Sequence, residues 1–411
     1  MKQRPDLLDE NAPEGVEVVQ LTDEDAPTCH IYMEAQVFTP DSKRLVLHRS
    51  AHAHGSDKHD AAHRYLLCDL DAGGALSPIT DELGATAPSV SPDGTHLYYV
   101  IDELDDAGGR LTLRRVRLDG TDRRTLAVID GFPGAGFRPA LGVYPLSTIR
   151  SDGKRLAVQT GMRGTRDGRA TFGLVVFDLD RGTHALIHHG PSWHNMHPQY
   201  SRSLDAGAMR DIMIQNNHGG EYDVERDTLR ADIHAIRDDG SDLRDFPCGR
   251  DGDEHCHGHQ CWRGRSTWAI IGTNTQHPNT RHLVECRAVA GDGHRGNRTP
   301  GGTRNMLSRA AGFPRTAHFG TDLAGTRLVT DAEPYELGGR ILLLRLGEPG
   351  VDAAADLTAL AWTRTADVHT VSETHPHPFL SPDGTLAFFN SNESGTLQAY
   401  MIRGLPAGPK R

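Results

Sequence analysis

The chain has 411 residues, with 44 Lys and Arg against 55 Asp and Glu, and a formal net charge of −11. A negative charge of this size repels nucleic-acid backbones and anionic membrane surfaces, so we expect neither as a partner. The 45 glycines and 23 prolines predict many turns, and the 24 histidines are the unusual feature of the composition.

The amino-terminal segment 1–15 is polar and acidic, and no later window reaches the roughly 18 unbroken apolar residues that a membrane-spanning helix needs. The six cysteines are scattered and lack the dense spacing of a disulfide scaffold. We therefore expect a cytoplasmic protein with reduced thiols.

A turn motif recurs along the chain, each time followed by a β-rich segment. Proline presets one turn angle, Asp bonds its own backbone and Gly accepts a positive φ, so each full copy predicts a hairpin turn. The full or nearly full copies are Thr39-Pro40-Asp41, Ser91-Pro92-Asp93-Gly94, Ser151-Asp152-Gly153 and Ser381-Pro382-Asp383-Gly384, and degenerate copies lie at 204–206, 263–265 and 323–325. The Asp-equivalent positions are 41, 93, 152, 205, 264, 324 and 383, so neighbouring copies lie 52 to 60 residues apart.

Seven copies at this period, with about four strands each, predict an all-β fold, a seven-bladed β-propeller. Two unrelated β-sandwiches would not produce evenly spaced copies, and the chain lacks the 3.6-residue apolar periodicity of a βαβ fold. We expect a single domain over 1–411, with blades starting near residues 28, 84, 142, 194, 256, 315 and 373.

Histidines recur just before these turns, where the innermost strand of each blade would line the central channel. His375 and His197 lie eight residues before the Asp-equivalent position, and His377 and His318 lie six before it. Equal parity places such side chains on one face of a strand, so they converge at one mouth of the channel. His259, five before, joins them if its turn is one residue shorter, and His30, eleven before, is a displaced case. A single such histidine would usually be an ordinary polar residue, but convergence from several blades predicts a site.

Three local histidine groups have different interpretations. In Thr374-His375-Pro376-His377-Pro378, alternate imidazoles can offer two nitrogens to one ion, and such ligands suit Mn²⁺, Fe²⁺ or Zn²⁺. In the segment 254–261, Cys256 and Cys261 are a weak candidate for a structural zinc site, and a strand with one or two rings facing the channel is favoured. The third group lies in a long polar insertion of the first blade, for which we expect a solvated or adventitiously metal-binding loop. Its members are His48, His52, His54, His59 and His63.

These motifs resemble those of the oligogalacturonate lyase family, in the same order along the chain. The matching segments are 16–41, Met196-His197-Pro198-Gln199-Tyr200, Asn217-His218-Gly219-Gly220, Gly258-His259-Gln260-Cys261-Trp262, Ala317-His318-Phe319 and 374–378. The resemblance implies a cytoplasmic seven-bladed propeller enzyme with a divalent metal cofactor, usually Mn²⁺. It also implies β-elimination from short uronate oligosaccharides, with breakage of the C4–O4 bond and formation of a 4,5-unsaturated sugar.

The resemblance assigns roles position by position. His318, His375 and His377 match the metal histidines, His259 matches the catalytic base, and we assign substrate binding to His30, His197 and His218. The family's glutamine ligand corresponds to Ser372, so Ser372, its neighbour Glu373 or water would complete the metal site, with Glu373 our choice. The family's charge-stabilising arginine aligns with Asp232, and Arg230 and Arg226 are the shifted candidates, with Arg230 preferred.

The expected function is therefore metal-dependent lyase activity on a uronate oligosaccharide substrate, as in pectin degradation. Two alternatives remain open. A non-catalytic propeller that serves as a binding platform would hold no tight metal, and a metal-dependent hydrolase would release a product without a double bond.

Overall fold

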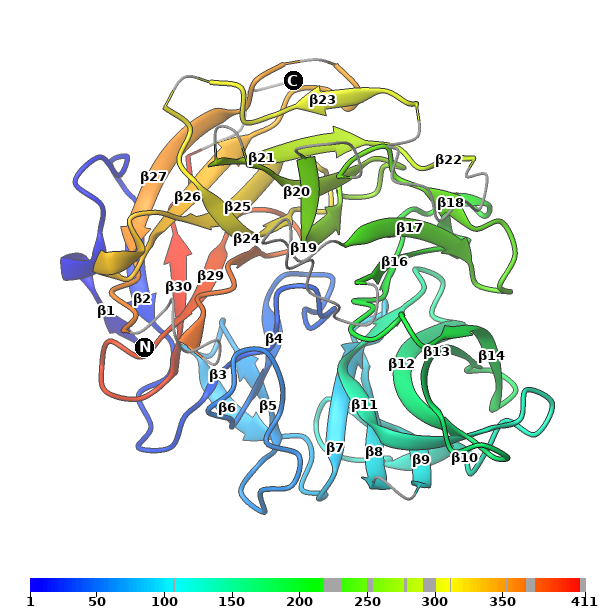
Figure 1. The fold of residues 1–411 in the computed structure, drawn as a ribbon. Coiled ribbons are helices and arrows are strands. Elements are labelled where there is room, and N and C mark those ends of the chain that lie inside the picture. The colour runs from blue at the N-terminus through cyan, green and yellow to red at the C-terminus, as the bar shows by residue number, and fades with distance from the viewer. Residues whose placement is uncertain are drawn as a thin grey trace.

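The computed structural model describes residues 1–105, 108–217, 231–249, 254–276, 279–290, 301–310, 312–351, 353–366 and 374–406. These residues form seven antiparallel sheets arranged around a central axis (Figure 1). No α-helix occurs among them, and their 3-10 helices are η1 (Pro5–Leu7), η2 (Ala208–Arg210) and η4 (Tyr335–Leu337). No described helix is long and apolar enough to cross a membrane. The predicted seven-bladed β-propeller is confirmed.

Each sheet is one blade, with its strands in hydrogen-bonded order from the centre outward. Blade 1 holds β3 (Cys29–His30), β4 (Arg44–His48), β5 (Tyr65–Asp69) and β6 (Ala75–Pro78). Blade 2 holds β7 (Ala85–Val90), β8 (His96–Asp105), β9 (Gly108–Arg117) and β10 (Arg124–Ile129). Blade 3 holds β11 (Phe137–Ile149), β12 (Arg155–Gly164), β13 (Ala170–Asp178) and β14 (Thr183–Gly190). Blade 4 holds β15 (Gln199–Tyr200), β16 (Asp211–Asn216), β17 (Asp232–Arg237), β18 (Arg244–Asp245) and β22 (Val289–Ala290).

The remaining three blades complete the ring. Blade 5 holds β19 (Glu254–Trp262), β20 (Ala269–Gln276), β21 (Asn279–Cys286) and β23 (Arg304–Met306). Blade 6 holds β24 (Thr316–Thr321), β25 (Arg327–Ala332), β26 (Arg340–Arg345) and β27 (Asp356–Trp362). Blade 7 holds β28 (Phe379–Leu380), β29 (Ala387–Ser391), β30 (Gln398–Arg403), β2 (Glu17–Gln20) and β1 (Lys2–Gln3). The first strands of successive blades contact one another, as β7 does with β11 and β24 with β28, so these strands surround the central channel.

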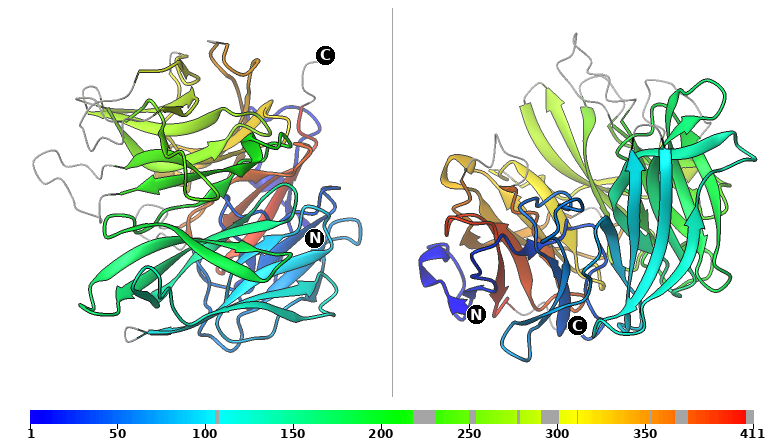
Figure 2. Two further views of the ribbon diagram at one scale, coloured as in Figure 1. Left: turned by 90° about the vertical axis from the view of Figure 1, so that its right-hand side faces the viewer. Right: turned by 90° about the horizontal axis from the view of Figure 1, so that it is seen from below.

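Blade 7 is built from both ends of the chain. β2 pairs antiparallel with β30, with Val18 opposite Ile402, and β1 adds one more strand outside β2. The first and last segments, blue and red, accordingly lie side by side in every view (Figure 2). This pairing places both ends of the chain in one blade and so closes the ring of sheets.

The recurring turns connect the innermost strand of a blade to the next strand. In blade 2, the Ser91 hydroxyl donates to the Asp93 carboxylate, which also accepts the backbone N–H of Thr95. Gly94 has a φ of +69°, and a Cβ there would lie 2.7 Å from Cδ of Pro40 in the turn of blade 1. Glycine is thus required both by the backbone conformation and by the close approach of the neighbouring blade.

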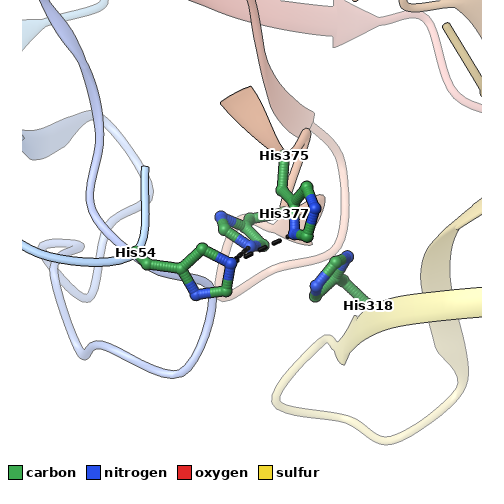
Figure 3. A group of neighbouring side chains, drawn as sticks. All are labelled: His54, His318, His375 and His377. Carbon is green, nitrogen blue, oxygen red and sulfur yellow. Dashed lines mark hydrogen bonds between the residues drawn. The ribbon is translucent and has the colours of Figure 1, made fainter. Parts of the chain in front are cut away.

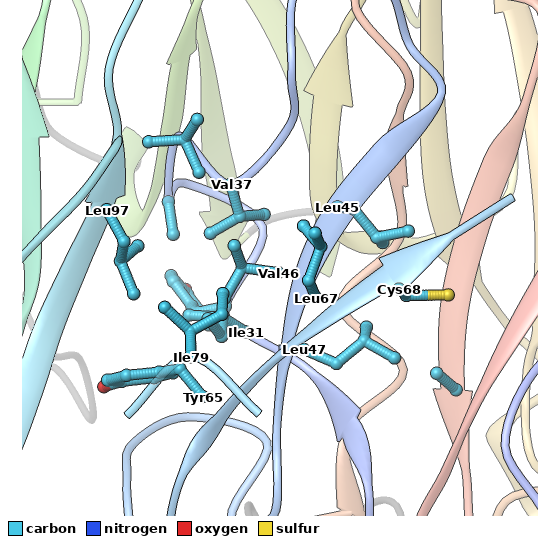
Figure 4. Packing of buried hydrophobic residues seen from close by; sticks show 14 of the residues in the cluster. Ile31, Val37, Leu45, Val46, Leu47, Tyr65, Leu67, Cys68, Ile79 and Leu97 are labelled. Atoms are coloured by element: carbon cyan, nitrogen blue, oxygen red, sulfur yellow. The ribbon is translucent and has the colours of Figure 1, made fainter. Parts of the chain in front are cut away.

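The hydrophobic core lies between the blades. One cluster joins side chains of β4 and β5, such as Leu45, Leu47 and Cys68, to Leu97 of β8 and to Phe388 of β29 (Figure 4). Because a middle strand packs against a neighbouring blade on both faces, apolar residues succeed one another in β4 instead of alternating with polar ones. Similar clusters join the other pairs of neighbouring blades and hold the inner strands in fixed positions.

Candidate metal centre and active site

Four histidines meet at one mouth of the channel: His54, His318, His375 and His377 (Figure 3). One ring nitrogen from each lies within 4.8 Å of those from the other three. His54 Nε2 lies 3.1 Å from Nδ1 of His375 and 3.1 Å from Nε2 of His377. Three blades supply this cluster, because His54 follows β4, His318 lies on β24 and the other two precede β28.

The strands place these rings through local departures from regular pairing. The register between β24 and β25 shifts between Thr316 and Phe319, which re-aims His318 toward the channel. His377 has a φ of +43°, a conformation that costs a residue with a Cβ about 1 to 3 kcal/mol and that is concentrated at functional sites. The Pro376 carbonyl between the two histidines accepts the backbone N–H of Asn390, which fixes the segment against blade 7.

A buried carboxylate orients His318. Its ring Nδ1 donates to Asp331 Oδ2 over 2.9 Å, and its backbone N–H donates to Asp331 Oδ1 over 2.7 Å. Burial alone would raise the pKa of Asp331, but its interactions with His318 hold that pKa below the usual value. With Nδ1 engaged, Nε2 of His318 is the nitrogen left for the channel, which is the arrangement of a metal-binding histidine with a supporting carboxylate.

Two rings of the cluster, those of His54 and His377, have lowered pKa values and are neutral at neutral pH. Burial, followed by the nearby imidazoles of His318 and His375, lowers the pKa of His54 to about 2. Burial and the same kind of neighbours lower the pKa of His377 well below its ordinary value. Neutral imidazoles offer lone pairs. His54 Nε2 lies equally far from two other ring nitrogens, and a single proton can bridge only one such pair, whereas a cation can be bound by all three nitrogens.

The donor set fits a divalent first-row transition metal. Two nitrogens that each lie about 2.1 Å from one ion, at tetrahedral or octahedral angles, are separated by about 3.0 to 3.4 Å. The separations of 3.1 Å from His54 fall in this range. Imidazole ligands suit Zn²⁺, Fe²⁺, Ni²⁺ or Cu²⁺, and they also occur with Mn²⁺ when oxygen ligands share the site.

A cavity of about 550 Å³ adjoins this cluster and holds the predicted base. His257, His259, His197, Tyr144 and His54 are among its lining residues. Its described lining contains no Lys or Arg, so a bound carboxylate would have to be held by a metal or by groups outside these residues. The size is that of an ordinary small-ligand site.

His259 lies beside the metal cluster on β19. Its ring centroid is 4.4 Å from that of His318, and its Nδ1 is 3.0 Å from Nδ1 of His257. A register shift in β19 between Cys256 and Gln260 turns both rings into the cavity. Burial, together with the imidazole of His318, lowers the pKa of His259 well below its ordinary value, so the ring is unprotonated at neutral pH.

His197 lies on the cavity wall in a fixed orientation. Its Nδ1 is 2.9 Å from Glu34 Oε2, and the Tyr144 hydroxyl is 2.9 Å from its Nε2. Its backbone has a φ of +48°. His30, by contrast, is fully buried, and its ring nitrogens lie 2.8 and 3.2 Å from the carbonyl oxygens of Ile31 and Pro376. His30 therefore supports the His-Pro-His segment from behind, instead of facing substrate as we expected.

Other predicted residues lie outside the described part of the chain. These are His218, Arg226, Arg230, Ser372 and Glu373. The two cysteines considered for zinc do not share an ion, because Cys256 packs between blades 4 and 5 and Cys261 between blades 5 and 6.

The first-blade insertion agrees only in part with the solvated or adventitiously metal-binding loop that we expected. His52 and His59 are exposed, whereas His48 and His63 are buried and His54 belongs to the metal cluster. The available signal was the alternation of His52 and His54, which repeats the pattern of His375 and His377.

A second cavity of about 270 Å³ lies at the opposite mouth of the channel, among the recurring turns. Its described lining, which includes Glu34, is more apolar and contains no histidine. The metal-binding and proton-accepting groups are therefore concentrated at the histidine mouth.

Comparisons with known proteins agree with this architecture. No family model matches the sequence, and no curated protein matches it. An oligogalacturonate lyase from Vibrio parahaemolyticus is 17% identical, with a TM-score of 0.70 over 100% of this chain and 99% of that one. An oligogalacturonate lyase in complex with manganese is 18% identical, with a TM-score of 0.70 over 98% and 96% of the two chains. A Kuenenia stuttgartiensis hydrazine synthase chain reaches a TM-score of 0.52 at 13% identity, covering 93% and 97%. The chain thus has the seven-bladed fold of solved oligogalacturonate lyases over its whole length, as the sequence resemblance implies.

Proposed function

We propose that this protein is a metal-dependent lyase that cleaves short uronate-containing oligosaccharides by β-elimination. The observation that carries the proposal is the group of four imidazoles, convergent from three blades, directly beside the unprotonated ring of His259. The same fold in two oligogalacturonate lyases, one of them in complex with manganese, supports the substrate class and the metal.

Different residues carry out metal binding and proton transfer in the proposed reaction. His318, His375 and His377 would hold the divalent cation, for which Mn²⁺ is the candidate from the family resemblance. When bound, such a cation attracts the uronate carboxylate and so acidifies the neighbouring C5–H bond. His259, neutral and within the cavity, accepts the C5 proton. The electrons of the C5–H bond form the C4=C5 double bond as the C4–O4 bond breaks.

The surroundings of His259 favour this role. The Nδ1 atoms of His257 and His259 are 3.0 Å apart, so one of the two rings must donate a hydrogen bond to the other. This hydrogen bond fixes the orientation of the His259 ring. A fixed and desolvated base spends no free energy on reorganisation during proton transfer. The cavity beside it has room for a disaccharide-sized ligand.

The test is incubation of the purified protein and Mn²⁺ with digalacturonate and with other uronate oligosaccharides, followed by ultraviolet absorbance of the unsaturated product. We expect His259→Ala to lose activity by about 100-fold or more, since general-base catalysis contributes about 10² to 10⁴. His189→Ala, which alters an exposed histidine of β14 in blade 3, is the matched control and should keep full activity.

The outcomes separate the alternative functions. Product mass distinguishes elimination from hydrolysis, because a hydrolysed product gains one water and lacks the double bond. A protein that binds no metal and converts no uronate would instead be a binding platform. If His259→Ala kept near wild-type activity, the assignment of the base would be wrong.

A further inference from the structure

The insertion of blade 1, between β4 and β5, places His54 at the histidine mouth of the channel. The Ala51 N–H donates to Asp57 Oδ2 over 2.8 Å, and the Ser56 hydroxyl lies 3.0 Å from that of Thr86 in blade 2. Ala53 is fully buried beside His54. The His54 ring also stacks on Tyr32, with centroids 5.2 Å apart and an interplanar angle of 28°. Hydrogen bonds before and after His54 in the chain and the stacking on Tyr32 therefore hold this imidazole in place.

We propose that His54 is the fourth protein ligand of the metal centre and that it shifts the metal preference toward cations that favour nitrogen. The equal 3.1 Å separations from His375 Nδ1 and His377 Nε2 place its Nε2 where a ligand of the same ion belongs. This ligand comes from blade 1, whereas the family resemblance implies an oxygen ligand from Ser372, Glu373 or water, and these two residues lie outside the described part of the chain. Replacement of an oxygen donor by an imidazole favours Zn²⁺, Fe²⁺ or Ni²⁺ relative to Mn²⁺.

Metal binding itself tests this inference, so the result is independent of lyase activity. Wild type, His54→Ala and His54→Gln are equilibrated with Zn²⁺ and Mn²⁺ in competition with a chelator of known affinity, and bound metal is measured by elemental analysis. We expect His54→Ala to lower Zn²⁺ affinity at least tenfold and Mn²⁺ affinity less. His54→Gln, which restores an oxygen donor, should lower the ratio of Zn²⁺ to Mn²⁺ affinity further.

A spectroscopic count of ligands completes the test. X-ray absorption of the zinc-loaded protein should show four imidazoles in wild type and three in His54→Ala. His59→Ala, an exposed histidine of the same insertion, is the control and should match wild type. Equal zinc affinity and an equal imidazole count in wild type and His54→Ala would overturn the inference, and circular dichroism checks that each variant is folded.

A separate observation concerns the other wall of the cavity, where Glu34, His197 and Tyr144 form a chain of contacts. Glu34 and His197 are buried and 2.9 Å apart, and the Tyr144 hydroxyl, 2.9 Å from His197 Nε2, borders the cavity that contains His259. The residue before the strained backbone of His197 is anchored twice, because Gln159 accepts the N–H of Met196 and the Met196 carbonyl accepts the N–H of Gln215. The surrounding strands thus fix His197 between the carboxylate and the hydroxyl.

We infer that Tyr144 is the acid that protonates the departing oxygen, an inference that rests on the proposed lyase function. As the C4–O4 bond breaks, its electron pair stays on O4, which takes the hydroxyl proton of Tyr144. The phenolate then regains a proton from solvent, while the ring of His197, held by Glu34, keeps the phenol oxygen in place. The C5 proton leaves His259 for solvent, so the overall reaction is elimination without gain or loss of atoms. His197 and Glu34 are positioning residues in this scheme.

A substrate whose leaving group needs no proton distinguishes a catalytic acid at Tyr144 from a tyrosine with only a structural role. The wild type, Tyr144→Phe and Glu34→Gln are compared on a uronate disaccharide and on a 4-deoxy-4-fluoro-uronoside, with absorbance of the double bond and release of fluoride as readouts. We expect Tyr144→Phe to lose about 10² to 10⁴ in kcat/KM on the disaccharide and to stay within a few-fold of wild type on the fluoride. Glu34→Gln should show the same selectivity with a smaller loss.

The controls distinguish the possible failures. Tyr98→Phe, a tyrosine of β8, should match wild type on both substrates. Equal loss on both substrates, or no loss on either, would overturn the role of Tyr144 while leaving the lyase function intact. If the wild type formed no double bond from either substrate, the proposed function would fail, and this inference with it.

Discussion

The two mouths of the channel are built on opposite principles. At one mouth, the recurring turns satisfy their own polar groups, as where the Asp93 carboxylate accepts from Ser91 and Thr95. At the other mouth, blades contribute unlike residues, and two of the channel histidines, His197 and His377, have positive φ angles. His257 Nε2 and His377 Nδ1 are buried there with no hydrogen-bond partner among the described residues.

The difference shows that the recurring turns mainly stabilise this repeat protein, whereas the histidine mouth carries the groups for metal binding and catalysis. A motif copied from blade to blade holds neighbouring blades together, because turns of neighbouring blades contact one another, as Gly94 does Pro40 and Gly264 does Gly325. Polar groups without partners and strained backbone are costly, and they persist where a ligand or a reaction uses them. Substitutions at the histidine mouth should therefore change metal binding and activity, whereas those at the turn mouth should change stability alone.

The largest effect is expected from His377→Ala. This residue is fully buried, and its Nε2 is 3.1 Å from that of His54, so its removal takes a ligand from the centre of the cluster. We expect loss of bound metal and a fall in activity of about 1,000-fold or more, as for loss of the metal's role in catalysis. Elemental analysis and initial rates measure the two effects. Retention of stoichiometric metal would contradict the assignment of His377 as a ligand.

A smaller effect is expected from Asp331→Asn, because Asp331 supports His318 and is not itself a proposed metal ligand. The carboxylate receives both the ring and the backbone N–H of His318, and an amide would weaken the hold on the ring. Loss of such a supporting partner costs about 10- to 100-fold in metal affinity or activity. Chelator competition measures the affinity. An unchanged affinity would mean that packing alone orients His318.

The fold and part of the site were predictable from the sequence, for a physical reason. The turn motif recurs because every blade needs the same turn, so its period predicts the propeller. His318, His375 and His377 lie at equivalent positions relative to their turns, and this shared position predicted that they face the channel. The register shift near His318 and the positive φ of His377 show that regular strand parity is not what finally aims these two rings. The structure brings all three together.

The rest of the site depends on features that strand parity does not contain. His54 reaches the cluster through a loop whose path is set by packing against Tyr32 and blade 2. The position of His259 depends on an irregularity within β19, and that of His30 depends on carbonyl groups from two segments. Loops, bulges and supporting contacts are products of the assembled ring, and no local pattern encodes them.

At the turn mouth, Gly94→Ala should affect stability and leave the site unchanged. The φ of +69° opposes a side chain, and so does Pro40, whose Cδ would lie 2.7 Å from the new Cβ. We expect a loss of about 1 to 3 kcal/mol in the free energy of unfolding, with metal affinity and kcat/KM per folded molecule unchanged. Chemical denaturation and chelator competition measure these quantities. A change in metal affinity would show that the two mouths are coupled.

The smallest effect is expected from Ser381→Ala in the turn of blade 7. The Ser381 hydroxyl donates to Asp383 over 2.6 Å and accepts the backbone N–H of Leu386 over 3.0 Å, so alanine removes a local network at the point where the chain enters β29. The turn keeps its backbone hydrogen bonds in this variant, including the one that the Gly384 N–H donates to the Ser381 carbonyl. A loss of about 1 kcal/mol in unfolding free energy follows from the modest net value of such bonds. Since Ser381 lies only four residues after His377 in the chain, unchanged metal affinity in this variant would show that the separation between the mouths is spatial, along the channel axis, and does not depend on distance in sequence.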